Sequence, residues 1–223
     1  GVRDASARRK RNTNKNRDAR RVVEVDAFPY VRDALAYGGL IVVTAASVAD
    51  GEVTTPEALA LVAADVPFRI VPGVTAAIGG LAYAGIPMTH RATATAVTFV
   101  TGHNLSGKVP DDLDWSSLAN GAQVLVFYMA LKHIDEIIDR LIAAGRSPDT
   151  PAALVAHATT DAQQVVVTTL LEAKQAAADV SPPALFVVGE VVRLRDGLDW
   201  LGALSGRALD PDPLGHSDIR DAV

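Results

Sequence analysis

The sequence predicts an α/β fold with largely parallel sheets, divided into two domains. Short apolar runs alternate with segments of helical character along most of the chain, and strands separated by helices are typical of this class. Apolar residues make up 49% and charged residues 21% of the chain, as in globular proteins. The 223 residues suffice for one large domain or two small ones.

The elements predicted in the first half each have a local signal. A buried strand follows the Gly38-Gly39 turn, and Pro56 after two threonines marks the first turn of a helix. Pro72-Gly73 ends a further strand and leads into a helix of small residues, which would let the backbone approach a ligand or a sheet closely. The predicted elements are strands 22–25, 40–43 and 68–71 and helices 57–64 and 75–84.

The alternation continues in the second half. The amphipathic segment Ile134–Ala144 predicts a helix that ends at Gly145, and apolar runs such as Val124–Tyr128 predict strands. The predicted strands are 97–100, 124–128, 153–156, 163–169 and 185–188, and the predicted helices are 134–144 and 170–178.

Changes of charge and composition set the predicted boundaries. Residues 1–21 contain nine Lys and Arg and two Asp, a net charge of +7, whereas the remainder carries −12. We interpret this basic segment as solvated and disordered, because it has few apolar side chains to bury. Nucleic acid binding is the less favoured alternative, because no aromatic residue interleaves the cations. The predicted parts are the basic segment 1–21, an N-terminal α/β domain 22–91, a C-terminal α/β domain 92–207 and an irregular tail 208–223.

The sequence disfavours several kinds of site. The chain has no cysteine, which excludes disulfides and thiolate metal sites and agrees with a reducing cytosol, so we expect a cytoplasmic protein. No apolar run reaches the roughly 18–20 residues that span a bilayer, and the five histidines lack metal-ligand spacing. Nucleophile-elbow, phosphate-loop and dinucleotide motifs are missing. We therefore expect neither a metal site nor membrane association.

Polar residues gather after predicted strands, where α/β proteins bind ligands. Pro72–Thr75 turns into a helix start with free N–H groups. Thr101–His103 and His157–Thr160 place hydroxyls and imidazoles after two strands, and Tyr128–Ala130 places a thioether after a third. Taken alone, the Pro-Gly segment could be an ordinary turn, Met129 could fill the core, and His103 and His157 could be helix caps. Together they predict one cleft formed by successive strand ends.

The order of short motifs after Val66 resembles that of the uroporphyrinogen-III C-methyltransferases of the tetrapyrrole methylase family. The match spans residues 66–207, and its ending, Leu198–Leu204, resembles the cobalamin-pathway members more than the fused sirohaem synthases. The matching segments also include Gly85–Arg91, Thr101–His103, Asp114-Trp115, Tyr128–Ala130, Leu141–Arg146, Thr150-Pro151, Ala158–Thr160, Gln163-Gln164, Pro182–Ala184 and Val187–Leu194.

The resemblance implies a homodimer of two α/β domains with the active site in the inter-domain cleft. It also implies S-adenosylmethionine as methyl donor, S-adenosylhomocysteine as product and uroporphyrinogen III as substrate. Two in-line transfers to pyrrole carbons would give precorrin-2 for cobalamin or sirohaem biosynthesis, with positioning as the main contribution of the protein.

Site residues are carried over from the resemblance one by one. Segments expected to face the cleft carry cations and imidazoles that would suit the carboxylates of the substrate. The implied donor contacts are Thr75, Ala76, Met129, Ala130 and Ala158. The implied substrate-facing residues are Thr89, His90, Arg91 and His103. No catalytic residue is assigned.

The part before Val66 does not match the family. The glycine-rich loop Gly-x-Gly-Pro-Gly-Asp-Pro is not readable in residues 1–40, and the donor loop Gly-Gly-Asp-Pro would fall on Ala45–Val48. Three explanations are open: an altered or incomplete sequence before Val66, a degenerate homologue that binds tetrapyrrole without methylating it, or another loop that supplies the donor contacts. We favour the first, because the join is abrupt.

Two further alternatives are weaker. A sister precorrin methyltransferase would share the fold, but the match through Gly85–Arg91 and Leu198–Leu204 favours the first-step enzyme. An oxidoreductase with a nucleotide-binding sheet beginning at Gly38–Ser47 lacks the dinucleotide fingerprint and leaves residues 66–207 unexplained.

Overall fold

The computed structural model describes residues 36–37, 40–44, 59, 62–63, 68–71, 73–104 and 106–215. The chain divides into two compact units, residues 1–47 with 51–73 and residues 48–50 with 74–223. Among the described residues, no helix combines the length and the apolar character needed to cross a membrane.

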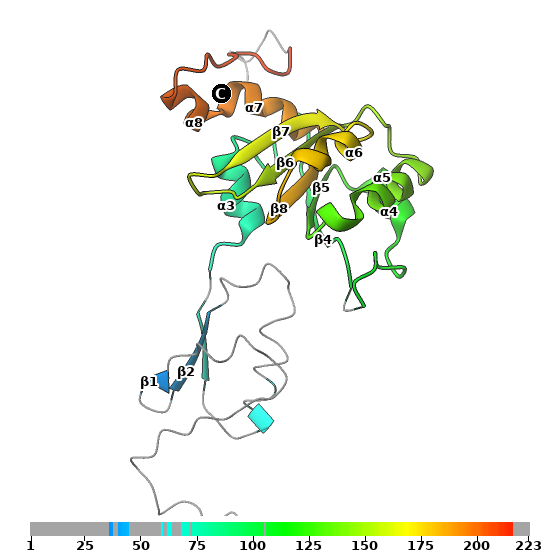
Figure 1. Ribbon diagram of the computed structural model, residues 1–223. Helices are drawn as coiled ribbons and strands as arrows, with labels where there is room; N and C mark the ends of the chain where they lie inside the picture. The colour runs from blue at the N-terminus through cyan, green and yellow to red at the C-terminus, as the bar shows by residue number, and fades with distance from the viewer. Residues whose placement is uncertain are drawn as a thin grey trace, which may run out of the picture. The chain divides into compact units, whose positions relative to one another are not determined.

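The first unit contains a three-stranded sheet of order β1-β2-β3 (Figure 1). The strands are β1 (Ala36–Tyr37), β2 (Leu40–Thr44) and β3 (Phe68–Val71). β1 pairs antiparallel with β2, and β2 pairs parallel with β3. The predicted strands 40–43 and 68–71 are therefore confirmed. Leu59, Val62 and Ala63 are helical within the predicted helix 57–64, whereas the predicted strand 22–25 lies outside the described residues.

The second unit is built on a five-stranded sheet of order β4-β5-β8-β6-β7 (Figure 1). The strands are β4 (Val97–Thr101), β5 (Val124–Tyr128), β6 (Pro151–Ala156), β7 (Gln164–Thr169) and β8 (Ala184–Val188). All five strands predicted from the second half of the sequence are confirmed, with shifts of up to two residues at their ends.

The prediction of a largely parallel arrangement is wrong for this sheet. Only β4 and β5 pair in parallel, whereas β8 lies antiparallel between β5 and β6, and β7 is antiparallel to β6. The connection from β6 to β7 comprises only residues 157–163, which is too short for the crossover that a parallel pair requires. The sheet is consequently mixed, with β4, β5 and β6 running in one direction.

Helices and 3-10 turns connect and flank these strands. The predicted helices 75–84 and 134–144 are confirmed, and the predicted helix 170–178 is divided into a short α-helix and a 3-10 turn. The elements are α3 (Ala76–Tyr83), α4 (Trp115–Gly121), η3 (Leu131–His133), α5 (Ile134–Ala143), α6 (Ala173–Ala176), η4 (Ala177–Asp179), η5 (Glu190–Leu194), α7 (Arg195–Leu198) and α8 (Trp200–Leu204).

Alternation along the strands produces a core on each face of the sheet. In β5, Leu125 and Phe127 belong to one buried cluster and Val124 and Val126 to the other, because successive side chains point to opposite faces. α5 packs in the first cluster and α3 in the second, on opposite sides of the sheet in Figure 1. Both faces are therefore covered, which explains why the central strands β5, β6 and β8 are buried along nearly their whole length.

α3 packs with the second unit, although the predicted limits 22–91 placed it in the first domain. Its Ala77 and Leu81 side chains are fully buried in the cluster that also contains Val126 and Val187. The small residues of α3 permit this close contact with the sheet. The domain limits 22–91 and 92–207 stay a prediction.

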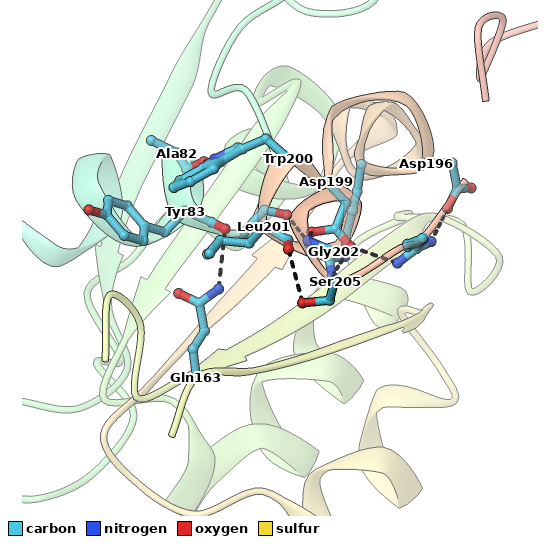
Figure 2. Close-up of polar contacts among 12 residues, drawn as sticks. Ala82, Tyr83, Gln163, Asp196, Asp199, Trp200, Leu201, Gly202 and Ser205 are labelled. Atoms are coloured by element: carbon cyan, nitrogen blue, oxygen red, sulfur yellow. Dashed lines mark hydrogen bonds and ion pairs between the residues drawn. The ribbon is translucent and has the colours of Figure 1, made fainter. Parts of the chain in front are cut away.

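The C-terminal end of α3 is held by side chains from distant parts of the chain. The indole Nε1 of Trp200 donates to Ala82 O (3.0 Å), and the amide Nε2 of Gln163 donates to Tyr83 O (3.2 Å), as Figure 2 shows. The guanidinium of Arg195 donates to Ala84 O. These donors bind carbonyl groups in the last turn of α3 and at its C-cap, so α3 is fastened to the rest of the unit.

Arg195 belongs to a buried ion-pair network centred on Asp199. The Asp199 carboxylate, which is 3% exposed as a residue, lies 2.9 Å from the Arg195 guanidinium and 2.9 Å from that of Arg207. It also caps α8 by accepting from Gly202 N (3.1 Å; Figure 2). Burial lowers the pKa of Arg195 and the Asp199 charge opposes that shift, while an arginine stays protonated in either case.

Asp114 caps α4 and makes part of the stability dependent on pH. Its carboxylate accepts from Ser117 Oγ (2.6 Å) and from Ser117 N (2.9 Å), and these hydrogen bonds lower the pKa of Asp114. A lowered folded pKa means stabilisation that is fully present above the unfolded value of about 3.9 and is lost as the pH falls through the folded pKa.

We expect Asp114→Asn to melt at a lower temperature than the parent at about pH 7, because a neutral amide is a weaker cap acceptor than a carboxylate. Thermal unfolding between about pH 7 and pH 3 tests this, and the difference should shrink as the pH falls. Asp112→Asn, at an exposed position nearby, is the matched control. A difference independent of pH would contradict the assignment.

Candidate functional site

A cavity lies at the edge of the five-stranded sheet where β4, β5 and β6 end and β8 begins. These three strands point the same way, so their carboxyl ends meet at one edge. The cavity has a volume of about 490 Å³, within the range of small-molecule sites. The strand ends and the start of α3 line it through Ala76, His103, Met129, His157, Ala158 and Ala184. Residues after β4, β5 and β6, which the sequence predicted to converge on one cleft, line this single cavity.

Strained backbone concentrates at this edge. Among the described residues, the non-glycine residues with positive φ are Met129 (53°), His157 (47°) and Thr159 (69°), directly after β5 and β6. This conformation costs free energy for residues with a side chain and persists where the surroundings impose it, commonly at functional sites. The positive φ angles of Met129 and His157 determine how these two residues lie in the lining of the cavity.

Gly102 allows the end of β4 to approach the end of β5. Its N–H donates to Tyr128 O (2.7 Å). A Cβ atom at Gly102 would lie 2.7 Å from Met129 O and 2.8 Å from Ala130 Cα. Only glycine permits this spacing, so Gly102 determines how Met129 is presented to the cavity.

A hydrogen bond joins the start of α3 to the end of β5. Thr75, the N-cap residue of α3, does not cap the helix with its side chain. Its Oγ1 instead shares a hydrogen bond of 2.6 Å with the hydroxyl group of Tyr128, whose residue lines the cavity. The tie holds the first turn of α3, including Ala76, at the cavity wall.

The loop after β6 is held against the segment that precedes β8. The His157 N–H donates to Pro183 O (2.9 Å), and His157 Nε2 shares a hydrogen bond of 2.9 Å with Ser181 Oγ. Thr160 Oγ1 donates to His157 O (2.7 Å). These bonds order the wall that contains His157, Ala158 and Pro183.

The structure brings together most, but not all, of the residues singled out in the sequence. Ala76, Met129, Ala158 and His103 line the cavity, and Thr75 adjoins it through Tyr128. Ala130 follows Met129 but is buried in the core beneath the cavity wall rather than in the lining.

The segment Thr89–Arg91 is not part of the cavity lining. It follows α3 and forms a small bridge in which His90 N donates to Ala94 O (2.7 Å) and Ala94 N donates to His90 O (2.8 Å). The side chain of Arg91 is exposed. A substrate-facing role for these residues stays a prediction.

Sequence reasoning missed the contribution of β8 and η3. Pro182, Pro183, Ala184 and Leu185 reach the cavity because β8 is inserted antiparallel and therefore begins where its neighbours end. The motif Pro182–Ala184 had been recognised as matching the family and could have indicated this wall. Lys132, also in the lining, had no such signal.

Comparison with known proteins places the chain among methylases of tetrapyrroles. Residues 46–174 match the family Tetrapyrrole (Corrin/Porphyrin) Methylases, which is more than half of the chain. A uroporphyrinogen-III C-methyltransferase from Sinorhizobium sp is 59% identical over 167 residues, covering 74% of this chain and 60% of the relative. A siroheme synthase from Stutzerimonas stutzeri is 54% identical over 142 residues, covering 63% of this chain and 30% of the relative.

Solved structures agree with this placement. The uroporphyrin-III C-methyl transferase from Thermus thermophilus complexed with S-adenyl homocysteine is 34% identical, with a TM-score of 0.55 over 62% of this chain and 60% of the other. The cobalt precorrin-4 methyltransferase CbiF, at 22% identity and a TM-score of 0.59, supports the fold alone. The chain thus spans about 60% of the length of the Sinorhizobium and Thermus relatives.

Proposed function

The chain belongs to the tetrapyrrole (corrin/porphyrin) methylases, and from this premise we propose that it is a uroporphyrinogen-III C-methyltransferase using S-adenosylmethionine. The observation that carries the proposal is the convergence of Ala76, Met129 and Ala158 on one cavity. The family resemblance implied these positions as donor contacts, and three separate segments of the chain present them at one edge of the sheet.

The lining of the cavity suits an adenosyl group. Small side chains at Ala76, Ala158 and Ala184 leave room for a flat ring, and Leu185 and Val155 supply apolar contacts. Sites of about this volume with few polar groups are typical for small ligands. We propose that Ala76, Met129 and Ala158, with Thr75 and Ala130 beside them, hold the donor.

In the proposed reaction, the donor supplies an electrophilic methyl carbon that a pyrrole carbon attacks, while sulfur leaves with the bonding electrons as S-adenosylhomocysteine. The residues of the chain position the two reactants and exclude water. Met129 is suited to this task because its strained backbone and the close approach of Gly102 hold it in place. His103 lies in the same lining and would face the substrate.

The remaining features of the proposal rest on the family. We propose that Thr89, His90 and Arg91 face the carboxylates of uroporphyrinogen III, in a cleft between two α/β domains of a cytoplasmic homodimer. The product would be precorrin-2, for cobalamin or sirohaem biosynthesis. The chain has no cysteine, which is consistent with a reducing compartment.

Calorimetric titration with S-adenosylhomocysteine tests the donor site. We expect one site per chain, and Met129→Glu should abolish binding because it places a carboxylate in an apolar cavity wall. Leu171→Glu is the matched control, since Leu171 is 50% exposed and lies outside the lining. It should bind as the parent does.

A methyl-transfer assay with uroporphyrinogen III completes the test. Binding of the tetrapyrrole without binding of S-adenosylhomocysteine, by folded protein, would overturn the methyltransferase proposal and leave a tetrapyrrole-binding homologue. Transfer to a later precorrin, but not to uroporphyrinogen III, would indicate a sister methyltransferase.

A further inference from the structure

We propose that Lys132 forms a carboxylate-binding site within the cavity. The proposal rests on the proposed function for the identity of the ligands, and on the charges of the lining for the site. The site belongs to η3, an element that the sequence did not predict.

The described lining of the cavity contains a positive side chain and no negative one. Among the described residues that line the cavity, Lys132 is the only Lys or Arg, and none is Asp or Glu. Lys132 is exposed as a residue, so its ammonium group is accessible to a ligand that enters the cavity from solvent. The cavity therefore favours a ligand that carries a negative group near Lys132.

Lys132 is not engaged elsewhere in the described part of the chain. Its neighbours on α5 are acidic, yet Glu136 pairs with Arg140 (2.7 Å), and no carboxylate of the described residues forms an ion pair with Lys132. Lys174 differs, because it pairs with Asp139. The Lys132 ammonium is thus available to a ligand.

His103 lines the same cavity but does not act as a second donor. Its Nδ1 donates to Asn104 O (3.1 Å), so Nε2 of the neutral ring is an acceptor, and the carboxylate is assigned to Lys132 alone. The ring also packs edge-on against that of His133, with centroids 6.2 Å apart, and η3 places His133 directly after Lys132.

Lys132 thus gives the cavity a positive group, and no acidic side chain among the described lining residues neutralises it. A carboxylate is the ligand group that matches this arrangement.

Both proposed ligands carry carboxylates. The donor has one, on its amino acid part, and uroporphyrinogen III carries several on its side chains. The two sources can be separated because 5′-methylthioadenosine keeps the adenosyl group and lacks the amino acid, and because uroporphyrin III is a stable oxidised form of the tetrapyrrole.

The test is Lys132→Met, which keeps the apolar stem and removes the charge. We expect its affinity for one carboxylate ligand to fall about tenfold, as for a lost charge-assisted hydrogen bond, with 5′-methylthioadenosine unaffected. Calorimetry with S-adenosylhomocysteine and absorbance titration with uroporphyrin III identify the ligand. Lys132→Arg should restore part of the loss. Lys108→Met, at an exposed position outside the lining, should change neither affinity.

Acetylation of lysines followed by mass spectrometry gives a second readout on the parent protein. The carboxylate ligand should protect Lys132 and leave Lys108 reactive. Unchanged affinities in Lys132→Met, or no protection by either ligand, would overturn the carboxylate site even if the parent methylates uroporphyrinogen III. Protection by uroporphyrin III in a parent that transfers no methyl group would support the site and refute the proposed activity.

Discussion

Replacing Asp199 by alanine is expected to lower the free energy of unfolding by about 3–5 kcal/mol, as for other buried pairs broken on one side. The substitution leaves the Arg195 guanidinium, 9% exposed as a residue, without its carboxylate partner, and also removes the cap of α8. Arg195 further donates to Ala84 O, so the end of α3 should loosen. Urea unfolding followed by circular dichroism measures the effect.

Two comparisons make this expectation specific. The double substitution Arg195→Met with Asp199→Leu should cost less than Asp199→Ala alone, because no charge remains buried without a partner. Glu190→Ala breaks an exposed pair with Arg193 and should cost about 1 kcal/mol or less. An Asp199→Ala protein as stable as the parent would show that the network does not hold α7 and α8 to α3.

Gly102→Ala is expected to weaken S-adenosylhomocysteine binding and to slow methyl transfer about 100-fold, the loss of rate that a displacement of about 1 Å can cause in a positioned site. The added Cβ would lie 2.7–2.8 Å from backbone atoms of Tyr128, Met129 and Ala130. These backbone atoms cannot rotate away as the end of a flexible side chain can, so the backbone at Met129 must shift. Calorimetry measures the loss of affinity, and thermal unfolding measures the accompanying loss of stability.

Gly121→Ala is the matched control for this substitution. No described residue beyond its chain neighbours and its own helix backbone has an atom within 4 Å of a Cβ atom at Gly121, so the same chemical change should leave affinity unaltered. If Gly102→Ala bound S-adenosylhomocysteine as tightly as the parent, the close approach of β4 to β5 would not position the donor site.

Much of the second unit could be predicted from local sequence. The strand Val124–Tyr128 and the amphipathic helix that begins at Ile134 are confirmed because burial and periodicity act over a few residues. Short elements such as α7 and α8 were missed, since they have little periodicity and are held by Asp199 and Trp200 instead. Their stability comes from contacts that no local pattern records.

The features of the candidate site also fall into two groups, those that local sequence predicts and those that depend on the tertiary structure. The sequence by itself determined the kinds of groups at the strand ends, the family after Val66 and the small residues at Ala76 and Ala158, because these are properties of short segments. Only the tertiary structure decided that β8 enters antiparallel between β5 and β6, that Thr75 bonds Tyr128 and that Lys132 joins the cavity. These contacts join residues far apart in the chain, and their geometry depends on the order of strands in the sheet.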